Sequence, residues 1–136
     1  FYSKLVSGEA SLVEAWDGWC NYGIAENADI SWVVPEEGSD LWVDTITVLA
    51  DSPQQDEAMR FVNYILDVEV GTFVAEHILY KVPNRAAMDA VDPAIVEQFP
   101  NMGMTAAELL EGESVVDLGE YSVEYTRLAT EIAAAG

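Results

Sequence analysis

An apolar run from Leu41 to Ala50, rich in β-branched residues, is the feature that most constrains what this chain folds into. The run follows an acidic turn that ends at Gly38, and its composition predicts an extended strand. Two stripes of apolar residues at helical spacing come next, over residues 58–66 and 70–78, and we expect the first to be buried. Strands that lead directly into amphipathic helices are typical of α/β proteins, so the sequence predicts an α/β fold.

Shorter elements are predicted on both sides of this region. Two further strands are expected over residues 10–16 and 30–34, where apolar and β-branched residues precede turn signals. Asn84, Asp92 and Thr105 each stand where a side chain caps the first amides of a short helix. A last amphipathic helix is expected toward the C-terminal end of the chain.

The charge of the chain excludes some classes of partner. There are 25 acidic residues against 5 basic ones, a formal net charge of −20, and this field repels nucleic acid phosphates and anionic membrane surfaces. No apolar run is long enough to cross a bilayer. We therefore expect no nucleic acid partner and no membrane insertion. The acidic residues are spread along the chain, which favours a surface adapted to high salt over a field that attracts cationic ligands.

Catalytic and metal-binding motifs are absent from the sequence. The single cysteine, Cys20, and the single histidine, His77, give neither a thiol dyad nor a metal quartet, and His77 falls on an apolar helical stripe. No phosphate-binding loop or nucleophile elbow occurs. Carboxylate pairs are uninformative because acidic residues are so abundant. We expect no enzymatic activity, no cofactor and no metal, and an enzyme that uses a carboxylate pair remains the alternative.

Aromatic and acidic residues at the ends of predicted elements favour binding of an organic cation. Trp42 and Asp44 are two residues apart, so a strand would direct both side chains to one side. An indole face attracts an ammonium group, and a carboxylate pairs with it. Trp16, Trp19 and Tyr80 also lie at element ends, where clefts form in α/β proteins.

Four segments follow one another in a specific order along the chain. They are Gly8-Glu9-Ala10 leading to Trp16-Asp17-Gly18, Val34-Pro35-Glu36-Glu37-Gly38 with Leu41-Trp42-Val43-Asp44, the helix from Ala58 to Leu66, and Tyr80-Lys81-Val82-Pro83-Asn84-Arg85-Ala86-Ala87. Each segment alone is a weak signal, whereas their ordered succession is specific. In this succession the chain resembles the periplasmic spermidine/putrescine-binding proteins of polyamine ABC transporters, closely over roughly residues 5–90 and more loosely in the tail.

The resemblance implies a fold like that of type II periplasmic binding proteins, in which two lobes joined by hinge crossings close over a ligand. This chain would be the C-terminal fragment, with the N-terminal portion of the same protein missing. Residues 1–42 would belong to the second lobe, residues 43–82 to the first, and residues 83–136 would return to the second as C-terminal helices. The protein would act in the periplasm or at the cell surface and deliver a polyamine, spermidine or putrescine, to a permease.

The resemblance also implies roles for individual residues. Trp16 matches a cleft tryptophan, Trp42 an aromatic packed on the carbon chain of the ligand, and Asp44 a carboxylate that pairs with an amine. Tyr80 matches a tyrosine at the cleft. Trp19 stands where family members vary between small and acidic residues, so we expect it to alter which polyamine fits.

Functions other than polyamine binding remain as alternatives. The tail departs from the family near Val115, where the resemblance leads us to expect a polar cleft residue. A solute-binding protein for another amine, an amino acid derivative or a metal is the main alternative. A pure interaction module would instead expose an apolar patch and show no saturable binding of a small molecule.

Overall fold

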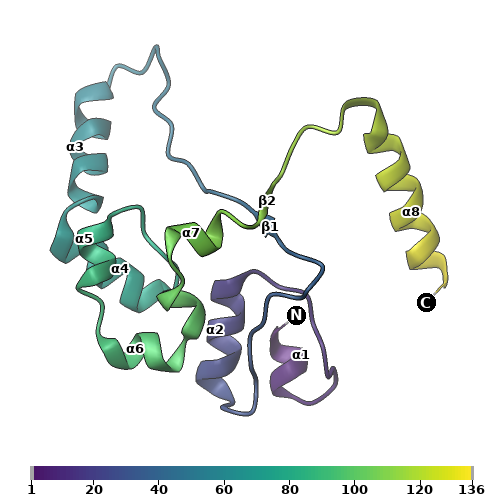
Figure 1. Cartoon of the computed structure of the whole chain (residues 1–136). Coiled ribbons are helices and arrows are strands. Elements are labelled where there is room, and N and C mark those ends of the chain that lie inside the picture. Colours follow the sequence, from purple (N-terminus) through teal and green to yellow (C-terminus); the bar gives the residue numbers. More distant parts are fainter. Residues whose placement is uncertain (1, 136) are drawn as a thin grey trace.

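Eight α-helices and one pair of very short strands make up the part of the chain that the computed structural model describes, residues 2–135. Two 3₁₀ helices complete the regular structure, and Figure 1 shows the arrangement. In chain order the elements are α1 Tyr2–Val6, α2 Asp17–Glu26, β1 Asp40–Leu41, α3 Gln55–Ile65, α4 Val68–Ile78, α5 Arg85–Asp89, α6 Pro93–Gln98, η1 Pro100–Gly103, α7 Ala106–Leu109, β2 Glu113–Ser114, η2 Gly119–Tyr121 and α8 Ser122–Ala135.

The helix starts predicted at Asn84, Asp92 and Thr105 are confirmed. The Asp67 carboxylate accepts hydrogen bonds from the amides of Glu69 and Val70 and begins α4. The side chains of Asn84 and Asp92 cap α5 and α6 in the same way. Thr105 and Glu108 form the capping box of α7. These starts depend on residues only a few positions apart, so local chemistry determines them.

The predicted strands are mostly not formed. Only β1 and β2 pair within the described residues, in parallel, with Asp40 opposite Glu113 and Leu41 opposite Ser114. Residues 10–16, 30–34 and 42–49 lie outside regular structure. A strand requires the amides and carbonyls of a neighbouring strand. Of the strand expected over residues 41–50, only Leu41 has such a neighbour, in β2.

A small apolar core lies between α4 and the helices that follow it. Its buried members are Ala75, Val91, Phe99 and Met102, and half-buried residues of α2, α5 and α6 pack around them. The contact of α4 with α5 is close, because a methyl group at Gly71 would lie 3.0 Å from the Ala87 Cβ atom. The core thus fixes α4 as the centre of the folded body.

Two hydrogen bonds join α2 to the C-terminal end of α4. The buried Asn21 amide donates to the Leu79 carbonyl at 2.8 Å, and the Tyr22 hydroxyl donates to the Ile78 carbonyl at 2.9 Å. The last carbonyls of a helix have no partner within the helix, so α2 supplies donors to α4. Leu79 adopts a left-handed conformation with φ of 53° and ends the helix there.

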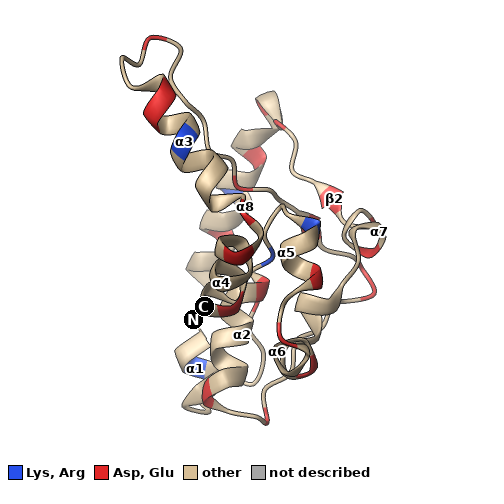
Figure 2. Cartoon of the chain, turned by 90° about the vertical axis from the view of Figure 1, so that its left-hand side faces the viewer, with Lys and Arg blue, Asp and Glu red and all other residues tan. Residues whose placement is uncertain are grey.

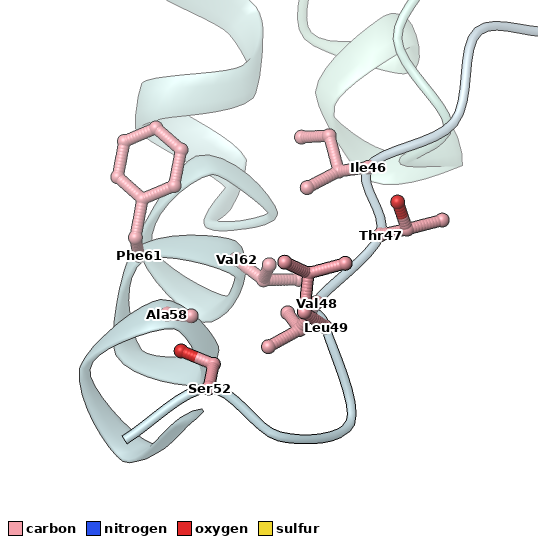
Figure 3. Close-up of a pocket in the computed structure, with 8 residues that line it drawn as sticks. All are labelled: Ile46, Thr47, Val48, Leu49, Ser52, Ala58, Phe61 and Val62. Atoms are coloured by element: carbon pink, nitrogen blue, oxygen red, sulfur yellow. The ribbon is translucent and has the colours of Figure 1, made fainter. Parts of the chain in front are cut away.

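The apolar stripe of α3 is not buried, contrary to the sequence prediction. No described residue of α3 is buried, and the Phe61 side chain is 58% exposed. The segment over residues 46–49 lies along one side of the stripe and leaves an open groove of about 220 Å³, which Figure 3 shows. The groove is lined by Ile46, Thr47, Val48, Leu49, Ser52, Ala58, Phe61 and Val62. One extended segment therefore covers only part of the apolar face.

Helix α8 stands apart from the other helices (Figure 1), and each of its described residues is exposed. Apolar side chains such as Leu128 and Ile132 lie on its surface. Acidic residues are distributed over helices and loops along the molecule (Figure 2). Among the described residues, no helix is both long and apolar enough to cross a membrane.

Loss of the α4 cap tests the local origin of this helix. We expect Asp67→Ala to lower the free energy of unfolding of the full-length protein by about 1 kcal/mol, because two helix amides lose their acceptor. Urea denaturation measures the change. Asp51→Ala, at an exposed turn residue that caps no helix, is the control. Equal stability of the two variants would contradict the capping role of Asp67.

Candidate ligand-binding site

Three aromatic side chains from distant segments meet in one cluster. The Trp16 and Trp42 ring centroids are 5.7 Å apart with planes at 49°, and those of Trp42 and Tyr80 are 6.1 Å apart with planes at 71°. Trp42 therefore contacts both of the other rings. The Trp16 side chain is 55% exposed, and Trp42 and Tyr80 are half-buried. This aromatic cluster of Trp16, Trp42 and Tyr80 offers accessible π faces.

Each member of the aromatic cluster is placed by the end of an element. Trp16 is the N-cap residue of α2, with an extended backbone at φ −60° and ψ 145°. Trp42 directly follows β1, whose pairing with β2 fixes the chain just before it. Tyr80 follows Leu79, at the end of α4 that α2 holds through two hydrogen bonds. The start of α2, the end of β1 and the end of α4 thus lie around one site.

The Tyr80 hydroxyl lies in an environment that favours its neutral form. Burial raises its pKa, and the negative charge of Asp17 raises it further. A smaller influence of Tyr22 acts in the same direction, and a hydrogen bond from the Trp19 backbone opposes it. The hydroxyl therefore stays protonated at neutral pH and is available as a hydrogen-bond donor.

A polar network that sequence reasoning missed lies beside the aromatic cluster. The Asp17 carboxylate accepts a hydrogen bond at 3.3 Å from the amide of Asn101, a residue that is only 1% exposed. The Lys81 ammonium donates to the Met102 carbonyl. Burial lowers the pKa of Lys81, while the charges of Asp17 and Glu108 raise it. Asp17 thus influences both Lys81 and Tyr80. Its one sequence signal was its position directly after Trp16.

Two further candidate residues, Asp44 and Trp19, have different surroundings. Asp44 is exposed and enters no hydrogen bond or ion pair within the described chain. Residues 42–44 are not in a strand, so the geometry that would direct Trp42 and Asp44 to one side is not formed. Trp19 packs on α1 and α2 instead, stacked on Tyr2 with centroids 5.5 Å apart and edge-on to Tyr22 at 5.5 Å.

The remaining candidate groups do not form a metal or thiol site. His77 is an exposed residue of α4, and its ring stacks on that of Phe73 with the ring centroids 3.8 Å apart. Burial, and secondarily Asp17, raises the pKa of the half-buried Cys20 thiol. Within residues 2–135, no three His, Cys, Asp or Glu side chains are grouped to hold a metal ion.

The family of the chain follows from comparison with known proteins. The model of the family described as "Bacterial extracellular solute-binding protein" matches residues 4–106, and the chain belongs to this family. No solved structure matches.

Curated relatives point to a narrower group within the family. The chain is 28% identical over 120 residues to the spermidine/putrescine-binding periplasmic protein of Salmonella typhimurium, covering 88% of this chain and 34% of the relative. It is 28% identical over 133 residues to spermidine/putrescine-binding periplasmic protein 1 of Haemophilus influenzae, and the match covers 98% of this chain and 37% of the relative. The putrescine-binding periplasmic protein PotF of Escherichia coli is 28% identical over 103 residues, and the match covers 71% of this chain and 28% of the relative. The chain thus spans about a third of the length of these relatives.

Removal of the Asp17 charge tests the electrostatics of the site. We expect Asp17→Asn to lower the pKa of Tyr80, because a nearby negative charge disfavours the phenolate. Ultraviolet difference titration measures this pKa when each protein is compared with the same protein carrying Tyr80→Phe. Glu14→Gln, at an exposed residue before the cluster, is the matched control. An unchanged Tyr80 pKa in the Asp17→Asn variant would contradict the assigned cause.

Proposed function

We propose that this chain is part of the solute-binding component of an ABC importer and binds a polyamine, spermidine or putrescine. The observation that carries the proposal is the aromatic cluster, which gathers Trp16, Trp42 and Tyr80 from distant segments. It occurs in a chain of the solute-binding family whose relatives are named for these two polyamines. Those relatives are binding proteins by name, which supports binding without turnover.

The chemistry of the site suits an organic cation with a carbon chain. The indole faces of Trp16 and Trp42 hold methylene groups and attract an ammonium group, and one desolvated contact of this kind is worth about 2 kcal/mol. The Tyr80 hydroxyl supplies a neutral hydrogen-bond donor and acceptor. Asp44, exposed and close to Trp42 along the chain, pairs with an amine of the ligand.

The fold proposed for the whole protein is the two-lobed fold of type II periplasmic binding proteins. Residues 1–42 and 83–136 contribute to the second lobe, and their link through β1 and β2 supports this division. Residues 43–82 are assigned to the first lobe by the resemblance alone, because Ala75 of α4 shares its core with residues of α2, α5 and α6 in the described chain. The segment over residues 42–45, which lies outside regular structure, acts as a hinge, and the ligand shifts the population toward the closed form.

The rest of both lobes comes from an N-terminal portion of the same protein. The exposed apolar stripe of α3 and the exposed face of α8 support this, because soluble domains bury such faces. The share of the relatives that the chain matches also supports a further portion, since the chain spans about a third of their length. The complete protein acts in the periplasm or at the cell surface and presents its polyamine to a membrane permease.

Removal of the Asp44 charge tests the proposed pairing. We expect Asp44→Asn to weaken the affinity of the full-length protein for putrescine and spermidine more than about tenfold, because a charge-assisted hydrogen bond to the ligand is lost. Isothermal titration calorimetry measures both affinities. Asp51→Asn alters an exposed carboxylate outside the site and is the control. Unchanged affinity in Asp44→Asn would remove Asp44 from the site.

Trp19 enters the proposal as a residue that influences ligand choice. It lies on the first turns of α2, next to Gly18, and packs with Tyr2 and Tyr22. We expect Trp19→Ala to change the ratio of the spermidine and putrescine affinities by several-fold, because the support for the start of α2 changes. Competition calorimetry measures the ratio. An equal loss of both affinities, or no change in either, would show that Trp19 does not select the ligand.

A further inference from the structure

The Tyr80 ring lies directly against the Cα atom of Gly18. A methyl group at Gly18 would overlap three atoms of this ring, Cε2, Cζ and Cδ2. Gly18 is fully enclosed, and its backbone is helical with no positive φ. An ordinary L-residue can adopt that backbone conformation. The glycine is therefore required by the space that the Tyr80 ring occupies and not by the turn of the chain.

The same contact brings the Tyr80 hydroxyl to the first turn of α2. The amides of this turn have no partner within the helix. The N-cap residue Trp16 makes no side-chain hydrogen bond to them. The Trp19 backbone lowers the pKa of the Tyr80 hydroxyl against the influences that raise it, which agrees with the phenol lying beside the first turn of α2.

The backbone around Tyr80 is fixed on both sides. Before it, α2 holds the carbonyls of Ile78 and Leu79. After it, the half-buried Lys81 ammonium is bound to the Met102 carbonyl. A displaced ring therefore has to rotate its side chain, since the chain on either side is held. Rotation changes its contact with Trp42, and through Trp42 the pairing with Trp16.

We propose that Gly18 is a positioning residue of the ligand site. Its lack of a side chain lets the Tyr80 ring lie against the first turn of α2. Tyr80 contacts Trp42, Trp42 contacts Trp16, and Trp16 is two residues before Gly18 in the chain, so the position of the Tyr80 ring affects all three aromatic residues. The proposal rests on the proposed function, because it assigns the aromatic cluster to the ligand. It adds that one small residue behind the cluster sets the arrangement of its faces.

A pair of alanine substitutions in the same helix tests this role. Gly18 and Gly23 are both buried glycines of α2, but a methyl group at Gly23 would come no nearer than 3.6 Å to Ile30, an ordinary contact. Alanine is the better helix former in general. We therefore expect Gly23→Ala to preserve the site and Gly18→Ala to disrupt it.

The first readout needs no ligand. Two indoles at 5.7 Å and 49° give a coupled circular dichroism signal that depends on their mutual orientation. In the ligand-free, full-length protein we expect Gly18→Ala to lose or change this signal and Gly23→Ala to retain it. A signal that is the same in Gly18→Ala and wild type overturns the proposal.

The second readout is the affinity for putrescine and spermidine, measured by calorimetry. We expect Gly18→Ala to weaken both about tenfold or more, with Gly23→Ala unchanged. Unaltered affinity in Gly18→Ala overturns the positioning role. If the wild-type protein binds neither polyamine, the proposed function fails, and the dichroism comparison still decides whether Gly18 positions the cluster.

A double substitution keeps the test decisive if Gly18→Ala unfolds. Removal of the ring in Tyr80→Ala leaves space for the added methyl group. We therefore expect Gly18→Ala to destabilise the wild type strongly and to have little further effect in the Tyr80→Ala background. If Gly18→Ala destabilises the protein equally in both backgrounds, the proposal is overturned, because the loss of stability then does not come from a clash with the Tyr80 ring.

Discussion

The attachment of α2 to the C-terminal end of α4 is the contact on which the rest of the structure depends. Two carbonyls that α4 cannot satisfy itself accept hydrogen bonds from Asn21 and Tyr22. This attachment sets the start of α2 beside the residues that follow α4. Trp16 and Tyr80, which are far apart in the sequence, are thereby placed around Trp42.

The sequence predicts those parts of the fold that local chemistry determines. Asn84, Asp92 and Thr105 cap helices where expected, because each cap involves amides two or three positions away. The strands and the burial of the α3 stripe were predicted less well. Both depend on neighbours from distant parts of the chain, and only β2 provides such a neighbour for a predicted strand.

The residues of the candidate site also fall into two groups, those that the sequence predicts and those that only the fold reveals. Trp16, Trp42 and Tyr80 were selected as aromatic residues at element ends, and the structure brings these three together. Asp17 was missed because its position directly after Trp16 does not by itself distinguish one carboxylate among 25 acidic residues, and its contact with Asn101 appears only in the fold. Gly18 is a further case, since only the position of the Tyr80 ring reveals why a helix holds a glycine there.

A crystal structure of the full-length protein grown with spermidine tests the central claim most directly, because the claim concerns where the ligand lies. The account predicts the carbon chain of the polyamine against the Trp42 indole, with Trp16 and Tyr80 beside it and an amine within reach of Asp44. A ligand bound away from these four residues, with the three rings unchanged, would contradict the account. The cluster would then be a structural contact between α2, the segment after β1 and the end of α4.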